Sequence, residues 1–471
     1  MKTLTTIAAP LAGGCCALLL SGCANFSPDG GFTAVKEEVK NAIGHDAHWL
    51  RDEQSKALAT QQVRTLLGQT LTAATAEQIA LLNNPVLQAE LAELQMQEAA
   101  LVEAGRIPNP GFSFAKTTGN GGQEVERGLH FNLLAFLTIP IRYGIEEERF
   151  ESVKLSAARS AIEFATDARM AYFEAVAARQ SVDYARQVLK AAGASRELMA
   201  RMSAVGNSSR LQHAREQLFH AQALAALAAA EQKAAGAQEA LVRALGLWGG
   251  QADIKLPEQL PDLPEAPREI KNLEQQAVDQ RLDLRQAKHA LKSLAANLQM
   301  TRSIGFLNVL ELGPAQVRER GDAIRDGYEV SLEVPIFDFG EIKSNKAQAQ
   351  YSQALNRLRG AAIAARSEVR GAYVSYRTAY DLARHYRDEI VPLRKRISDE
   401  QLLRYNGMLT GVFDLIADAR EQIISVNAYL ETLRQFWLAD TALRSAMLTG
   451  KAPPVNLAAA ASASPANGGG H

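Results

Sequence analysis

Short segments in which apolar and polar side chains alternate predict four β-strands. The alternation is strict in residues 328–334 and less regular in residues 111–118 and 129–137. It is weakest in residues 305–312, where Asn308 interrupts the apolar face. The segments form two pairs, and a stretch rich in glycine and charged residues separates the members of each pair. We therefore expect two β-hairpins.

Long helices are predicted after each pair of strands. Proline is absent between positions 140 and 257 and between positions 335 and 392, and both intervals are rich in strong helix formers. The expected helices are residues 141–204, 210–247, 341–405 and 412–448. At roughly 1.5 Å per residue, the first would be about 95 Å long. Pro392 should kink the third helix.

A short turn is expected between the two helices of each pair. The residues assigned to these turns are Val205, Gly206, Asn207 and Ser208 in the first, and Tyr405, Asn406, Gly407 and Gly411 in the second. Glycine adopts the backbone conformations that reverse a chain, so the glycines by themselves indicate only turns.

The chain is an internal duplication. Three motifs recur in the same order, each about 200 residues later: residues 85–89 match 283–287, 138–141 match 333–336, and 214–217 match 419–422. Three ordered matches at a nearly constant separation predict two copies of one unit, each built as helix, strand pair and two long helices. We assign the first repeat to residues 69–256 and the second to residues 270–450.

The remaining segments are simpler. Residues 257–269 are rich in proline and are expected to form an extended connector between the repeats. Residues 451–471, rich in alanine, serine, proline and glycine, are expected to form a disordered tail. Residues 23–68 are polar and are expected to be partly helical.

The N-terminus has the pattern of a lipoprotein signal. A basic residue precedes an apolar run that ends in Leu-Ser-Gly-Cys, so residues 1–22 are interpreted as a signal peptide and Cys23 as the acylated residue, carrying palmitate. The alternative is an ordinary secretory signal with a chance cysteine. All three cysteines lie at or before position 23, so no disulfide or thiolate metal site is expected in the mature chain.

Composition argues against catalysis and against nucleic-acid binding. The 51 basic and 52 acidic residues nearly cancel, so no global field attracts a polyanion. No phosphate-binding loop or nucleophile elbow is present, and the histidines are scattered. His45 and His48 are interpreted as a solvated surface pair. We therefore expect no enzyme activity, cofactor or metal site. The sequence after residue 23 has no apolar run of about 18 residues, so no membrane-spanning helix is predicted there.

Four strands from one chain are too few to form a closed cylinder. Strand edges cannot remain unpaired in hydrocarbon, and the smallest membrane barrels have about eight strands. If these strands cross a membrane, several chains must therefore share one barrel. A small soluble β-subdomain beside a helical bundle is the alternative.

The sequence resembles the TolC-like outer-membrane efflux proteins, lipoprotein subgroup, over about residues 65–450. The segments that carry the resemblance are residues 81–89, 104–110, 281–287, 334–340 and 405–420. The resemblance implies a mainly α fold with a small β part. Three chains would build a tunnel of long antiparallel α-hairpins and a shared transmembrane barrel with about twelve strands.

The resemblance also implies a function and roles for particular residues. The homotrimer would be a passive duct in the outer membrane, and its two helical turns would dock a periplasmic adaptor that links it to an inner-membrane pump. Asp414 matches the first aspartate of a carboxylate gate, whereas the second matched position is Ala417 and the nearest carboxylate is Asp418. A solvated charge on a helix is the alternative role for each. The alternative function is a periplasmic lipid-anchored coiled-coil adaptor or structural lipoprotein.

Overall fold

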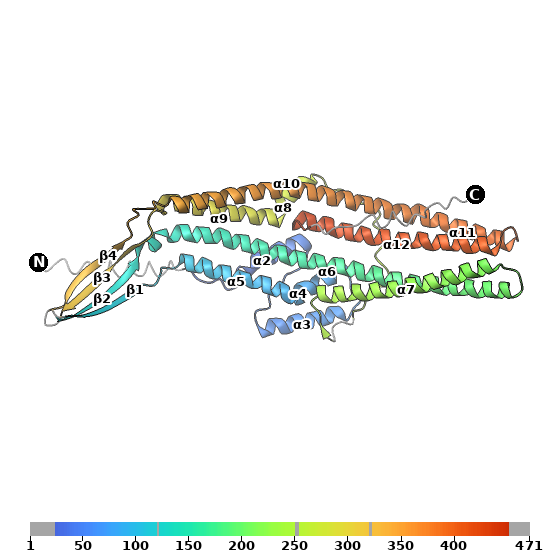
Figure 1. The fold of residues 1–471 in the computed structure, drawn as a ribbon, viewed down its shortest axis with the longest axis horizontal. Coiled ribbons are helices and arrows are strands. Elements are labelled where there is room, and N and C mark those ends of the chain that lie inside the picture. The colour runs from blue at the N-terminus through green and yellow to red at the C-terminus, as the bar shows by residue number, and fades with distance from the viewer. Residues whose placement is uncertain (1–23, 120–121, 250–253, 320–322, 452–471) are drawn as a thin grey trace. The chain divides into compact units, whose positions relative to one another are not determined.

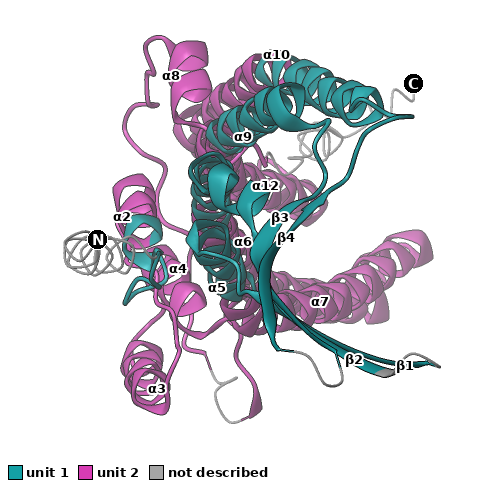
Figure 2. Cartoon of the chain, turned by 90° about the vertical axis from the view of Figure 1, so that its left-hand side faces the viewer, with its two compact units in different colours: residues 1–35, 90–157, 283–362 teal, residues 36–89, 158–282, 363–471 magenta. Residues whose placement is uncertain are grey.

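The computed structural model describes residues 24–119, 122–249, 254–319 and 323–451. These residues form two compact units, shown in different colours in Figure 2. Unit 1 contains residues up to 35, 90–157 and 283–362, and unit 2 contains residues 36–89, 158–282 and 363 onward. The signal peptide, Cys23 and nearly all of the C-terminal tail lie outside the described residues, so those expectations stay predictions.

Unit 1 contains a four-stranded antiparallel sheet in the order β1-β2-β3-β4 (Figure 1). The strands are β1 (Gly111–Gly119), β2 (Gly122–Asn132), β3 (Leu310–Glu319) and β4 (Arg325–Leu332). Two hairpins, one from each repeat, meet through the pairing of β2 with β3. The expected small β part of four strands is confirmed.

Two of the strand boundaries expected from alternation are wrong in the first hairpin. The second strand was placed at residues 129–137, whereas β2 ends at Asn132 and residues 133–137 are helical. The Asn132 side chain accepts a hydrogen bond from the Ala135 N–H at 2.7 Å, which caps the new helix. The strand extends instead into the charged stretch before residue 129, which we had interpreted as a loop.

The second hairpin differs in the same way. Residues 305–312 were expected to form its first strand, but the preceding helix continues to Ile304 and β3 begins only at Leu310. Its second strand begins at Arg325, three residues before the expected residues 328–334, and ends at Leu332. Most strand residues are exposed, so ladder hydrogen bonds and not apolar alternation set the extent of these strands.

Four long helices contribute to unit 1. They are α5 (Pro85–Gly105), α6 (Leu133–Ala204), α9 (Leu282–Ile304) and α10 (Glu341–His385), and each continues across the boundary between the units. Within unit 1, Ser152 of α6 donates to the Gln286 carbonyl of α9. The start of α6 corrects the expected boundary at residue 141, because Pro140 lies two turns inside the helix instead of before it.

The remaining α-helices of the described chain (Figure 1) lie in unit 2, apart from residues 32–35 of the first of them, which belong to unit 1. They are α2 (Phe32–Ile43), α3 (Glu53–Leu67), α4 (Ala73–Asn83), α7 (Arg210–Ala244), α8 (Leu273–Gln280), α11 (Val391–Asn406) and α12 (Val412–Leu448). The core of this unit is aromatic at its centre, where Phe436 packs against Tyr376 and Tyr380. The bounds of α12 match the expected ones, and α7 ends three residues early because Leu245 already caps it.

The disturbance expected at Pro392 takes the form of a π-helical turn. Residues Tyr386–Ile390 separate α10 from α11, so the expected single helix 341–405 is two α-helices joined by this turn. Proline has no N–H for the carbonyl four residues earlier, and its ring collides with that carbonyl. A wider turn just before Pro392 relieves both problems.

The proline-rich connector has no helix or strand and is held against the helices of unit 2. Its buried side chains are Leu260 and Leu263, and Leu256 just before it is also buried. Trp437 donates to its Pro261 carbonyl at 2.9 Å and Tyr380 to its Glu265 carbonyl at 2.7 Å. Arg179 donates to the carbonyl of Leu256, the residue just before it, at 2.8 Å. These contacts make the connector an ordered strap.

Replacing Gly313 with Ala should disrupt the contact between the two hairpins. A Cβ at this position would lie 1.5 Å from the Leu129 carbonyl oxygen, which belongs to the backbone of β2 and cannot rotate away. We expect a loss of stability of about 1–3 kcal/mol, the usual range for overpacking. The measurement is the fraction of protein that refolds into detergent micelles in a protease-resistant form.

Gly327→Ala is the matched control, because its Cβ would meet nothing closer than 4.0 Å. Equal refolding of the two variants would contradict the proposed role of Gly313.

Candidate functional site

The first helical turn has a complete set of capping interactions. After α6 ends at Ala204, the Gly206 N–H donates to the Ser203 carbonyl and the Asn207 N–H donates to the Met202 carbonyl. This is a Schellman motif with Gly206 in the left-handed conformation at φ +80°. Ser209 then caps α7 through a reciprocal pair of hydrogen bonds with Gln212.

The second turn repeats this geometry with different residues. The Met408 N–H donates to the Tyr405 carbonyl, and the Leu409 N–H donates to the Arg404 carbonyl. The left-handed residue is Met408, at φ +61°, whereas Gly407 has an ordinary φ of −80°. The turn lies where the sequence predicts it, but Met408 and not a glycine adopts the left-handed conformation. Gly407 caps α11, and the strained position falls on the next residue.

Both turns lie at the same end of unit 2, at the right of Figure 1. They expose large apolar side chains to solvent, with Met408 93% exposed. The other exposed apolar residues at or beside the turns are Val205, Leu211, Leu403 and Leu409. An exposed apolar patch of this kind is typical of a binding surface.

The two candidate gate aspartates have different surroundings. Asp414 accepts hydrogen bonds from the Thr410 hydroxyl at 2.8 Å and from the Gly411 N–H at 3.3 Å, and so caps the start of α12. Asp418 lies one turn later on the same face of the helix. Its Oδ2 is buried and has no hydrogen-bond partner among the described residues. Asp414 therefore has a structural role of its own.

A buried ion pair near the turns connects the two helical hairpins, and sequence reasoning missed it. Arg420 of α12 donates to Glu216 of α7 at 2.6 Å, and Ser195 of α6 donates to the same carboxylate at 2.7 Å. The Arg420 guanidinium also lies over the Phe219 ring at 4.2 Å. The repeated Ala-Arg-Glu-Gln motif contains both charged residues, but nothing in the sequence indicates that they contact each other.

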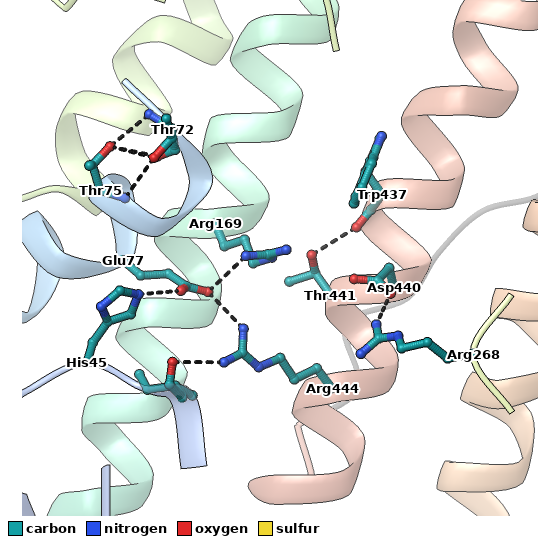
Figure 3. A network of polar contacts seen from close by, with 11 residues as sticks. His45, Thr72, Thr75, Glu77, Arg169, Arg268, Trp437, Asp440, Thr441 and Arg444 are labelled. Carbon is teal, nitrogen blue, oxygen red and sulfur yellow. Dashed lines mark hydrogen bonds and ion pairs between the residues drawn. The ribbon is translucent and has the colours of Figure 1, made fainter. Parts of the chain in front are cut away.

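A second buried ionic cluster in unit 2 centres on Glu77 of α4 (Figure 3). Its carboxylate contacts Arg169 and Arg444, each at 3.4 Å, and the His45 ring nitrogen at 3.3 Å. Arg444 also donates to the Ile43 carbonyl at 3.1 Å. Burial lowers the pKa of Arg444 from its ordinary value, and the neighbouring carboxylate opposes this effect. The cluster fixes the N-terminal segment to α6 and α12.

This cluster corrects the interpretation of His45 and His48 as a solvated surface pair. His45 is in an ion pair with a carboxylate that is 4% exposed, and burial lowers the pKa of His48. Their partners come from helices far away in the sequence, so spacing could not reveal them. Among the described residues, no group of three or more histidine, cysteine, aspartate or glutamate side chains is placed to hold a metal ion.

The segment that follows Cys23 is held in place within unit 1. Arg106, at the end of α5, donates to the Ala24 carbonyl at 3.2 Å. The Ser27 N–H donates to the buried Glu98 carboxylate at 2.6 Å. Hydrogen bonds from the Thr33 backbone and hydroxyl hold the pKa of Asp29 at about 2, so this residue stays ionised at neutral pH and orders the start of α2. No described helix is long and apolar enough to cross a membrane.

Comparison with known proteins agrees with this geometry. The family model described as outer membrane efflux protein matches residues 273–397. The channel CusC has 18% identity and a TM-score of 0.67, covering 83% of this chain and 92% of its own. The CmeC outer membrane channel of Campylobacter jejuni has 16% identity and a TM-score of 0.68, covering 83% of this chain and 89% of its own.

The open state of the MtrE outer membrane channel of Neisseria gonorrhoeae has 17% identity and a TM-score of 0.66, covering 80% of this chain and 88% of its own. No curated protein matches the sequence.

The similarity to these structures shows that the duplicated hairpins and the four-stranded sheet form the fold of outer membrane channels. The chain is therefore TolC-like in its fold, and residues 273–397 match the model of the outer membrane efflux proteins. The resemblance to outer-membrane efflux proteins that the sequence indicated is confirmed, and its lipoprotein subgroup stays a prediction.

Replacing Gly206 with Ala should destabilise the first turn by about 1–2 kcal/mol, the cost of a left-handed conformation for a residue with a Cβ. Gly407→Ala should be nearly neutral, because its φ is negative and its Cβ would meet nothing closer than 3.5 Å. Met408→Gly should stabilise the second turn by a similar amount. Hydrogen exchange of the amides at the two turns measures all three effects.

If the turn amides of the Gly206 and Gly407 variants lose equal protection against hydrogen exchange, the left-handed residue does not determine the stability of the turns.

Replacing Glu77 with Ala should destabilise unit 2 by about 3 kcal/mol, because two half-buried guanidinium groups lose their buried counter-charge. Asp167→Asn is the control, since its ion pair with Lys451 is exposed and should contribute less than about 1 kcal/mol. Denaturant titration of both variants in detergent measures the difference. Similar denaturant concentrations at the midpoint of unfolding for the two variants would contradict the structural importance of the Glu77 cluster.

Proposed function

We propose that the chain is the outer-membrane component of a tripartite efflux or export system, a passive duct formed by three copies. The match of residues 273–397 to the outer membrane efflux proteins is the observation that carries the proposal. The fold of the whole described chain, with its duplicated hairpins and four-stranded sheet, supports it.

The sheet supports a shared barrel and hence the trimer. Strands β1 and β4 are at the two ends of the sheet, so each has one edge without a partner strand among the described residues. Exposed apolar side chains on these strands suit a hydrocarbon environment: Phe112, Phe114, Tyr328, Val330 and Leu332. Pairing β1 of one copy with β4 of the next satisfies both edges, and three copies give about twelve strands.

The position of Ala24 supports acylation of Cys23 as a second anchor. Arg106 holds Ala24 at the end of α5, and β1 begins at Gly111, a few residues further along the chain. Acyl chains on Cys23 would therefore reach the membrane beside the strands of unit 1. Each buried methylene contributes about 0.8 kcal/mol, so several chains give a firm anchor.

The two helical turns are the proposed docking site for a periplasmic adaptor, which would in turn reach an inner-membrane pump. The support is the exposed apolar surface of the turns, with Met408 the most exposed side chain in it. Matching capping geometry in both turns would let three copies present six similar surfaces in a ring. Energy for export would come from the pump.

Asp414 and Asp418 are the proposed gate residues. They lie one turn apart on one face of α12, close to the second turn. Three copies would bring their carboxylates together around the axis of the duct and favour the passage of cations. The capping bonds of Asp414 would hold its carboxylate in a defined position in such a ring.

The test of the duct is made on the full-length chain expressed with its signal. We expect the protein in the outer-membrane fraction, a trimer in native mass spectrometry from detergent, and ion conductance in planar bilayers. Cys23→Ser should abolish palmitate labelling and leave the trimer, because the barrel is itself a membrane anchor.

A stable monomer without conductance would refute the duct. Palmitate labelling that persists in the Cys23 variant would refute the acylation site and leave the duct untouched.

A further inference from the structure

The register of the four-stranded sheet sorts its side chains onto two faces. Residues paired across antiparallel strands point to the same side, and neighbours along one strand point to opposite sides. Phe112 pairs with Leu129, and Leu312 pairs with both Phe131 and Val330. These five side chains therefore share one face of the sheet, which we call the apolar face.

The opposite face, which we call the polar face, carries nearly all of the acidic residues of the strands. They are Glu124, Glu126, Glu311, Glu319 and Glu329. Arg325 also lies on the polar face, where it forms an ion pair with Glu319 at 3.5 Å. Among the described strand residues, Asp326 is the only acid on the apolar face, and its carboxylate accepts a hydrogen bond from Gln316 at 2.8 Å.

Three basic residues, Lys116, Arg127 and Arg318, lie on the apolar face, and we call them the basic cluster. Lys116 and Arg318 both pair with Val125 of β2, and Arg127 lies two residues further along that strand. Arg127 is therefore the diagonal neighbour of the other two, about 7–8 Å from each and within reach of their long side chains. All three are exposed, and none has an acidic partner in the part of the sheet that the structure describes.

The basic cluster lies at the end of the sheet that is far from the helices (Figure 1). Lys116 is three residues before the end of β1, and Arg318 is one residue before the end of β3. The helices α5, α6 and α9 join the strands at their opposite ends. Phe131 lies six residues from Val125 on β2, which is about 20 Å at roughly 3.4 Å per residue. An apolar band of this height therefore separates the basic cluster from the helices.

A shallow groove runs from the basic cluster into the apolar band. Its volume is about 400 Å³. Phe112, Leu129 and Pro314 line one part of it, and Arg127 with Gln316 lines the part nearer the end of the strands. Apolar walls with a guanidinium at one end suit an amphipathic molecule that has an apolar chain and an anionic headgroup.

We propose that the basic cluster binds the phosphate groups of an anionic lipid in the outer leaflet of the membrane, with an acyl chain of that lipid in the adjoining groove. The proposal rests on the proposed duct, which places the apolar face against lipid and the helices in the periplasm. Three cations at this spacing repel one another. A phosphate that accepts hydrogen bonds from two or three of them removes this repulsion.

Charge and shape favour a phosphorylated lipid over other occupants. A second copy of the chain offers this face a single carboxylate, Asp326, which Gln316 already bonds. A free phosphate ion would leave the apolar groove unfilled. A lipid fills both parts, and basic side chains at the edge of an apolar band lie at the depth of lipid headgroups.

The test is native mass spectrometry of the full-length trimer in detergent, titrated with lipid A, an outer-leaflet glycolipid that carries phosphate groups. We expect one bound lipid per chain and weaker binding of the same lipid after enzymatic removal of its phosphates. Lys116→Gln, Arg127→Gln and Arg318→Gln should each weaken binding about fivefold, and the triple variant about a hundredfold, because each basic side chain contributes separately to the attraction of an anionic lipid.

Arg325→Gln is the matched control, because Arg325 lies at the same end of the sheet but on the polar face. We expect it to bind lipid A as the unchanged protein does. A second measurement needs no variant: added salt should weaken the binding of phosphorylated lipid A and leave the binding of the dephosphorylated lipid unaltered.

Equal affinity for the two forms of lipid A, or a triple variant that binds as tightly as the unchanged protein, overturns the lipid site and leaves the duct untouched. Displacement of the lipid by an equal concentration of inorganic phosphate would indicate a site for free phosphate instead. A triple variant whose trimer dissociates more readily while its lipid affinity is unaltered would assign the basic cluster to the contact between copies. A monomer without conductance overturns the lipid site together with the proposed duct.

Discussion

Strands β1 and β4 each leave one row of backbone N–H and C=O groups without a partner in the four-stranded sheet. In water such edges can pair with other chains and cause aggregation, and in hydrocarbon each unpaired group costs several kcal/mol. This constraint explains why exposed aromatic side chains such as Phe112 and Phe114 occur on strands that are otherwise well paired. In the proposed trimer, pairing of β1 of one copy with β4 of the next satisfies these groups.

Because one hairpin is duplicated, the same set of backbone hydrogen bonds closes both helical turns. The two turns share a Schellman motif and an N-cap three residues later, yet they place glycine at the left-handed position in one case and Met408 in the other. Backbone hydrogen bonds therefore preserve the geometry while side chains diverge. Divergence leaves Met408 exposed at the left-handed position of the second turn, at the cost of local strain.

Long-range polar contacts fix the parts of unit 2 that have no regular structure. The proline-rich connector is bonded through its carbonyl groups by Tyr380 and Trp437, since proline leaves the backbone with few donors of its own. Arg179 bonds the carbonyl of Leu256 just before it. Glu77 holds the N-terminal segment in a similar manner. Neither arrangement follows from local sequence, because each partner lies on a helix distant along the chain.

The recurrence of three motifs was enough to predict the duplication, and local sequence alone was enough to predict the four strands, the long helices and the positions of both turns. These features follow from periodicity, helix propensity and the placement of proline and glycine, which act over a few residues. The strand limits at Asn132 and Leu310, and the pairing of Glu216 with Arg420, were decided only by tertiary structure. Interstrand hydrogen bonds and interhelical ion pairs depend on which distant segments meet, and the chain must fold before they do.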